Sequence, residues 1–328
     1  MAAKAIKLGI QIAHEVVSFD DMLYLPLVLD MQMEQYQWVA VDESQDSNRL
    51  RREMARRMAS DRMLWVGDDR QSIYGFTGAD NDALDQIAEQ FNCRRFPMTE
   101  TRRCSQAVVA RARELVPDYT AHPSNPPGLV RTITPAQFEK EKLVPGDDVI
   151  ICRFTAPLVK SAHDLIRRGV GAHVAGRDIG ANLIALVNRW PSIKSVTTFK
   201  ERLLEYCQKE VGILLAAKKD AKAAALEDRV ASILAIMETL PANATLATLK
   251  NDIADLFREP APGSAEAASM VTLMTAHRSK GLEFKRVFGW MEFSIPPFAR
   301  QEWQRRQEEN LEYVRITRAI IEYVEVTA

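Results

Sequence analysis

Two adjacent carboxylates end a short apolar run at residues 38–41. Asp42 and Glu43 follow this run directly, and Gln45 and Asp46 come next. In open α/β sheets, ligands bind beyond the carboxyl ends of the strands. Asp42 is therefore placed to hold Mg²⁺, and Glu43 to orient or deprotonate a water that attacks a terminal phosphate. A helix cap at the end of a strand is the alternative interpretation, because acids and serine are common there.

A second polar cluster follows the next apolar run, residues 63–66. Within it, the Gln71 amide has the chemistry to contact a γ-phosphate or the attacking water. Phe76 lies between two glycines, and an aromatic ring on such a loop suits stacking on a nucleic-acid base. The alternative for Phe76 is a core position beneath a glycine-rich turn.

The two clusters, VDESQD and VGDDRQSIYGFTGAD, resemble motifs II and III of superfamily 1 DNA helicases of the UvrD/Rep/PcrA type. The segment at residues 99–105 stands where this family has an arginine that contacts phosphate, and Arg103 matches it. Arg102 replaces the usual aromatic residue that stacks on adenine. A guanidinium plane also stacks on rings, so the resemblance implies that Arg102 contacts the nucleotide base.

Residues 275–284, TAHRSKGLEF, resemble motif V of the same family. The resemblance implies that Thr275 and His277 face the DNA backbone. It also implies that Gly281 lets the chain approach the nucleotide, and that Glu283 binds ribose or helps to order the site.

Residues 307–319, QEENLEYVRITRA, match motif VI, and Arg318 is the candidate arginine finger. Arg153 ends a predicted strand, at a turn that the resemblance assigns to the DNA backbone. An ordinary charge at a strand end is an equally open interpretation of Arg153. The resemblance covers residues 16 to 328.

The elements that must position these residues alternate between strands and helices. The predicted fold class is α/β, with two RecA-like P-loop NTPase motor domains, of which the first is incomplete and the second carries a small helical insert. The resemblance places the nucleotide between the two motor domains. Five arginines between residues 49 and 57 indicate a solvated helix face rather than a nucleic-acid stripe. The predicted first motor domain is residues 1–97, and the second comprises residues 98–190 and 265–328, with the insert at residues 191–264 between them.

One expected motif is absent from the sequence. No G-x-x-x-x-G-K-[ST], the phosphate loop that holds the β- and γ-phosphates, occurs in the 328 residues. We therefore expect an N-terminally shortened ATP-dependent DNA helicase that is inactive alone. The expected cofactors are ATP and Mg²⁺. The expected partners are single-stranded and partly duplex DNA, and a separate chain that carries the phosphate loop would complete a split enzyme. The alternative is a non-catalytic remnant that binds DNA or a protein partner.

Composition is that of an ordinary globular protein, with 47% hydrophobic and 27% charged residues. The net charge of −1 requires any nucleic-acid contact to use a local groove rather than a globally basic surface. The four cysteines form no C-x-x-C pair, which argues for reduced thiols and against a zinc site or a disulfide framework. We expect a cytoplasmic protein, in a bacterial or phage-type host cytosol, with no membrane partner.

Overall fold

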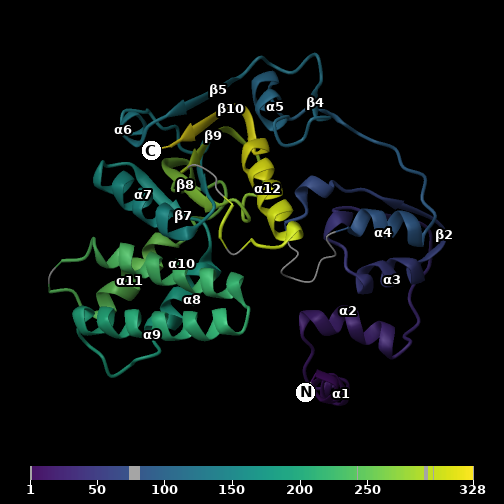
Figure 1. Cartoon of the computed structure of the whole chain (residues 1–328), viewed down its shortest axis with the longest axis horizontal. Coiled ribbons are helices and arrows are strands. Elements are labelled where there is room, and N and C mark those ends of the chain that lie inside the picture. Colours follow the sequence, from purple (N-terminus) through teal and green to yellow (C-terminus); the bar gives the residue numbers. More distant parts are fainter. Residues whose placement is uncertain (1, 74–81, 242, 292–294, 298, 328) are drawn as a thin grey trace. The chain divides into compact units, whose positions relative to one another are not determined.

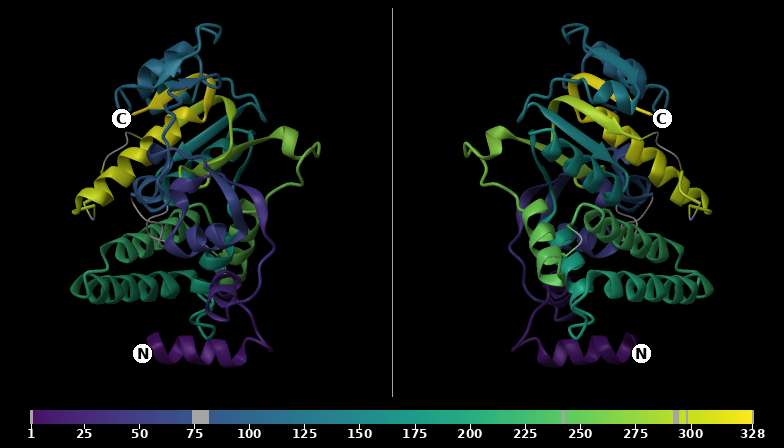
Figure 2. Two further views of the ribbon diagram at one scale, coloured as in Figure 1. Left: turned by 90° about the vertical axis from the view of Figure 1, so that its right-hand side faces the viewer. Right: turned by 90° about the vertical axis from the view of Figure 1, so that its left-hand side faces the viewer.

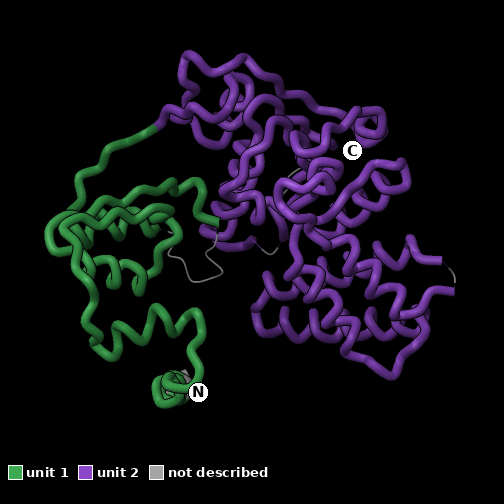
Figure 3. Tube along the Cα trace, turned by 180° about the vertical axis from the view of Figure 1, so that it is seen from behind, with its two compact units in different colours: residues 1–98 green, residues 99–328 purple. Residues whose placement is uncertain are grey.

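The computed structural model describes residues 2–73, 82–241, 243–291, 295–297 and 299–327. The chain forms two compact units, residues 1–98 (unit 1) and 99–328 (unit 2), which are coloured separately in Figure 3. The described helices include none that is both long enough and apolar enough to cross a membrane.

Unit 1 is built on a short parallel sheet. Among its described residues, β1 (Tyr36–Val41) pairs with β2 (Ala59–Trp65), and Val41 lies opposite Trp65. Helix α3 (Arg49–Met58) connects the two strands, and the side chain of Asn48 caps its first turn. The remaining elements of the unit are α1 (Ala2–Ile12), α2 (Phe19–Val28), η1 (Ser44–Asp46), η2 (Asp69–Gln71) and α4 (Ala83–Gln90).

The two faces of this sheet differ in burial. On one face, the Trp65 ring stacks on Phe91 at the end of α4, with ring centroids 5.1 Å apart. On the other face, Trp38 is 62% exposed and Leu64 is 51% exposed. A parallel sheet normally has both faces covered, whereas Trp38 and Leu64 remain exposed on this face of unit 1.

One of the five arginines of α3 departs from the expected solvated face. Arg52 is buried, and its guanidinium donates to Gln86 Oε1 of α4 over 2.7 Å and to the Ser47 carbonyl over 3.3 Å. The predicted interpretation of this helix is therefore wrong at Arg52, because a charged group joins α3 to α4 there.

Unit 2 contains a larger sheet. Among the described residues it has six strands in the order β5-β10-β9-β6-β8-β7, and neighbouring strands in this order run parallel. The strands are β5 (Leu129–Ile133), β6 (Asp148–Cys152), β7 (Gly171–Val174), β8 (Met270–Thr275), β9 (Phe284–Trp290) and β10 (Ala319–Val326). A separate short parallel pair joins β3 (Glu100–Thr101) to β4 (Thr120–Ala121).

Helices cover both faces of the large sheet. The crossover β6–α7–β7 runs toward one edge of the sheet, and β9–α12–β10 runs toward the other (Figure 1). Since such crossovers are right-handed, α7 (Thr155–Arg167) and α12 (Glu302–Thr317) lie on opposite faces. Alternate residues of β6 follow this division, because Ile150 belongs to the core cluster of α7 whereas Val149, equally buried, does not.

The helical region of unit 2 shares the core of the sheet. Its buried leucines, isoleucines and valines form one cluster with those of α7, β7 and β8. The two side views in Figure 2 show these helices, in green, stacked beside one another. They are α8 (Arg177–Val187), α9 (Val196–Ala216), α10 (Asp220–Met237) and α11 (Leu246–Leu256). The other short elements are α5 (Gln106–Ala112), α6 (Pro135–Phe138) and η4 (Ala267–Ser269).

Candidate nucleotide and DNA sites

The acid pair lies directly after β1, at the carboxyl end of a parallel strand. Glu43 adopts a left-handed backbone conformation, with a φ of 50°. Its amide donates to Asp42 Oδ1 over 2.8 Å. A non-glycine residue in this region costs about 1–3 kcal/mol, and such positions cluster at functional sites. Glu43 thus has a backbone conformation that is uncommon for a residue with a side chain.

A chain of hydrogen bonds joins the acid pair to Gln71. The Gln45 side-chain amide donates to Glu43 Oε2 over 2.5 Å, and its carbonyl accepts from the Asp68 amide over 3.0 Å. The Asp68 carboxylate in turn accepts from Gln71 Nε2 over 2.8 Å. The ends of β1 and β2 are also joined by the backbone, since the Ser44 amide donates to the Val66 carbonyl over 2.9 Å. Glu43 and Gln71 thus belong to one connected group.

Gln45 and Asp68 were not among the site residues predicted from the sequence. Gln45 is only 1% exposed. A Cβ added at Gly67 would come within 2.6 Å of Gln45 Oε1, so the glycine leaves room for the bridging amide. The sequence does contain a signal for Gln45, because this polar residue stands in DESQD, directly after an apolar run.

The predicted nucleotide residues of unit 2 gather where β9 and β10 begin. Arg103 Nε forms a short ion pair with Glu283 Oε1, across 180 residues of sequence. The backbone brings these segments together, because the Phe284 amide donates to the Arg318 carbonyl over 2.9 Å. The Ser105 amide likewise donates to the Ile320 carbonyl over 2.8 Å. Arg103, Glu283 and Arg318 therefore lie together at the amino ends of β9 and β10.

Arg318 is 1% exposed, and its guanidinium is held by its own domain. It donates to the carbonyls of Val314 and Leu282, over 3.1 Å in each case. Burial lowers the pKa of Arg318, and the positive charge of Arg103 lowers it further. To contact a phosphate, this buried guanidinium must first become accessible.

The predicted DNA residues of unit 2 lie at the other end of the strands, their carboxyl ends. Arg153 and Thr275 stand at the carboxyl ends of neighbouring strands, and the Ala276 amide donates to the Cys152 carbonyl over 2.8 Å. Arg153 donates twice to Glu308, over 2.7 Å each. Thr275 Oγ1 accepts from the Arg278 amide over 3.4 Å. Because all six strands are parallel, residues that follow strands lie at the carboxyl ends of the sheet, and residues that precede strands lie at the opposite, amino ends.

His277 is half-buried in the same turn. Loss of solvent lowers its pKa to about 3, and the positive charge of Arg153 acts in the same direction. The imidazole is therefore neutral near pH 7. It can donate a hydrogen bond to a phosphate but cannot pair with it as a cation.

The remaining predicted residues are Gly281, Arg102 and Phe76. Gly281 has a φ of 82°, which favours glycine at this turn. Arg102 is exposed beside Arg103. Phe76 lies outside the described residues, so its predicted contact with DNA stays a prediction.

The described residues of unit 1 fit Mg²⁺ that is held partly by substrate phosphates, rather than a metal ion held by protein side chains alone. Within the described ranges, no three His, Cys, Asp or Glu side chains converge to hold a metal ion. Mg²⁺ is commonly held by one or two carboxylates together with substrate phosphates and waters. Asp42 can supply one such carboxylate.

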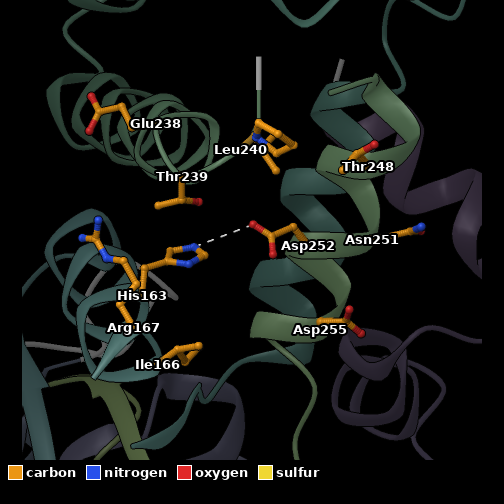
Figure 4. A pocket seen from close by; sticks show the side chains of 11 residues that line it. His163, Ile166, Arg167, Glu238, Thr239, Leu240, Thr248, Asn251, Asp252 and Asp255 are labelled. Atoms are coloured by element: carbon orange, nitrogen blue, oxygen red, sulfur yellow. Dashed lines mark ion pairs between the residues drawn. The ribbon is translucent and has the colours of Figure 1, made fainter. Parts of the chain in front are cut away.

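A hollow of about 520 Å³ lies within unit 2, between α7, α11 and the end of α10. Figure 4 shows the His163 ring pointing toward Asp252, with 3.8 Å between Nε2 and Oδ2. Burial lowers the pKa of His163 and raises that of Asp252. None of the site residues predicted from the sequence lines this hollow.

Both units match known protein families. Residues 11–92 match the UvrD/REP helicase N-terminal domain, and residues 184–322 match the UvrD-like helicase C-terminal domain. The α/β architecture with parallel sheets is consistent with helicase domains of this class. The chain therefore carries N-terminal and C-terminal helicase domains of the UvrD/Rep/PcrA family.

Individual relatives are similar over limited segments. "DNA helicase II" of Haemophilus influenzae is 29% identical over 93 residues, which cover 28% of this chain and 13% of that protein. "ATP-dependent DNA helicase Rep" of Buchnera aphidicola is 30% identical over 115 residues, or 32% and 17% of the two chains. "ATP-dependent DNA helicase PcrA" of Staphylococcus aureus is 26% identical over 114 residues, or 31% and 16%. The matched segments thus span less than a fifth of each relative.

Proposed function

We propose that this chain supplies catalytic residues of an ATP-dependent DNA helicase that moves 3′ to 5′ on single-stranded DNA and unwinds duplexes. The direction of movement is carried over from the family resemblance. The ATP requirement is suggested by relatives that are ATP-dependent DNA helicases.

The hydrogen-bond chain Glu43–Gln45–Asp68–Gln71 is the observation that carries the proposal. Hydrolysis requires a carboxylate that orients water and a group that contacts the terminal phosphate, both held at fixed positions. A buried amide that joins the ends of two parallel strands provides this fixed relation. A helix cap would not require Gln45 to bond to the segments that follow both strands.

Each residue has a distinct role in the proposed reaction. Bound Mg²⁺ would neutralise charge on the phosphates, with Asp42 as its protein ligand. Glu43 orients the attacking water, and Gln71 contacts that water or the γ-phosphate. Arg103 and Arg318 stabilise charge on the transferring phosphoryl group, and such an arginine is worth about 10³–10⁵ in rate.

The 328 residues contain no phosphate loop, so we propose that polypeptide bearing one completes the site. Such a loop supplies backbone amides and a lysine to the β- and γ-phosphates. The experiment is complementation. The chain is assayed for ATP turnover with single-stranded DNA, before and after addition of a polypeptide that carries a family phosphate loop.

Turnover is expected only in the complemented sample, and Glu43→Gln should abolish it. Glu15→Gln, which removes an exposed carboxylate of the same unit, is the matched control and should keep full turnover. A complemented sample that hydrolyses ATP equally well with Glu43→Gln would contradict the proposed role of the acid pair.

A second candidate function is a non-catalytic DNA-binding or partner-binding protein. The engagement of both arginines favours it, since Arg103 pairs with Glu283 and Arg318 with backbone carbonyls. Persistent binding of single-stranded DNA without turnover in any complemented sample would support this alternative.

A further inference from the structure

Arg103, which the resemblance assigns to a nucleotide phosphate, already forms an ion pair with a carboxylate of this chain. Arg103 pairs with Glu283, and both side chains remain partly exposed. A ligand can therefore reach the pair from solvent. An incoming anion would meet a cation that already has an internal partner.

The local charge favours an external anion. Leu282, the neighbour of Glu283, accepts a hydrogen bond from Arg318 Nη1 over 3.1 Å. Arg103 is close enough to Arg318 for its charge to lower the pKa of that side chain, while Glu283 has the opposite effect. Glu283 thus acts on two guanidinium groups, on Arg103 through an ion pair and on Arg318 through its charge at longer range, so one carboxylate faces two positive charges.

The backbone holds these side chains in place. The Arg103 amide donates to Thr101 Oγ1 over 3.2 Å, and the Phe284 amide anchors Glu283 to the start of β10. Separating Arg103 from Glu283 therefore requires only rotation of side chains. Partly exposed ion pairs are weak, whereas hydrogen bonds between arginine and phosphate are among the strong ones.

We propose that Glu283 is an internal competitor for Arg103, which holds the guanidinium in position until the polyphosphate of a nucleotide displaces it. This inference rests on the proposed function, because it assumes that Arg103 receives a phosphate. Glu283 is then a positioning residue that acts through Arg103. A role in binding ribose, the expectation from the resemblance, makes different predictions.

The test compares two ligands, sodium tripolyphosphate and ATP, on the full chain at low ionic strength. Tripolyphosphate has the phosphates without the ribose. Binding is followed by isothermal titration calorimetry, a readout that every variant shares. Glu283→Gln should bind tripolyphosphate about two- to five-fold more tightly than the parent chain, since it removes a weak competing ion pair. Adding Arg103→Gln to this variant should remove the gain.

Glu266→Gln is the matched control. Glu266 also forms a short ion pair with an arginine, Arg258, and its side chain is 42% exposed, the same fraction as Glu283. It should bind tripolyphosphate like the parent chain. Glu283→Asp, which keeps the charge but shortens the side chain, should give an intermediate affinity and guards against a fold that does not tolerate Gln.

Equal or weaker binding of tripolyphosphate by Glu283→Gln would overturn the inference. So would weaker binding of ATP with unchanged binding of tripolyphosphate, which is the result that a ribose contact predicts. Failure of all the variants to bind tripolyphosphate would also overturn it. The proposed function is tested separately by complemented ATP turnover, so either idea can fail while the other stands.

Discussion

At the scale of single residues, His277 has the most strongly altered chemistry among the predicted DNA contacts. Its pKa of about 3 follows from loss of solvent and from the charge of Arg153. Burial also lowers the pKa of His163 and His173. All three imidazoles are thus less basic in the folded chain than in the unfolded chain, where a value near 6.5 is usual.

Stability should therefore fall on acidification. Between about pH 6.5 and 3, the unfolded His277 binds a proton that the folded one does not, so the free energy of unfolding of unit 2 decreases as pH falls. One such group contributes up to about 1.4 kcal/mol per pH unit. Urea unfolding at pH 7, 6 and 5 measures this decrease.

His277→Gln should lose less stability than the parent chain over the same interval. His14→Gln, which removes an exposed imidazole, is the control and should follow the parent chain. An identical pH dependence of His277→Gln and the parent chain would show that the ring is not held neutral.

The candidate site residues that could be proposed from the sequence are those whose side chains can themselves act on a nucleotide. Asp42, Glu43 and Gln71 could be proposed from the sequence because acids and amides after apolar runs are visible there. Gln45 and Asp68 were missed, because their roles come from contacts between two strand ends. The pairing of Arg103 with Glu283, 180 residues apart, was likewise not accessible from spacing alone.

At the scale of elements, the order of strands and helices was predictable, whereas some boundaries were not. The sequence predicted a strand from Met63, but β2 begins at Ala59. Its first residues, among them Asp61 and Arg62, are exposed, so apolar periodicity could not identify them. The Arg62 guanidinium lies 5.2 Å from the centroid of the Trp38 ring, a contact that only the paired strands create.

The sheet of unit 1 should open more readily than that of unit 2. Among the described residues, β1 and β2 pair only with each other, while β6 and β8 lie inside a six-stranded sheet. Isolated two-stranded sheets are marginally stable, and unpaired edges invite self-association. Amide hydrogen exchange should therefore be faster in residues 38–66 than in residues 270–290. Slower exchange in residues 38–66 would contradict this ranking.

At the scale of the whole molecule, we expect weak binding of single-stranded DNA, with little sequence preference and strong salt dependence. Phe76→Ala should weaken binding by about 1–3 kcal/mol, the value of one base stack. Glu43→Gln should leave DNA binding almost unchanged, because the proposed role of Glu43 is in nucleotide hydrolysis. Fluorescence anisotropy on labelled DNA at several salt concentrations measures these effects. If Phe76→Ala binds like the parent chain, Phe76 is a core residue instead.

We propose that the 328 residues hold the acid pair and the arginines of a helicase motor, and they contain no sequence of the phosphate-loop pattern. ATP hydrolysis by the purified chain, with and without single-stranded DNA, tests this claim most directly. We predict turnover at or near background in both samples, because the β- and γ-phosphates lack the donors of a phosphate loop. Robust DNA-stimulated turnover that disappears with Glu43→Gln would contradict the account and reveal a phosphate-binding loop of another kind.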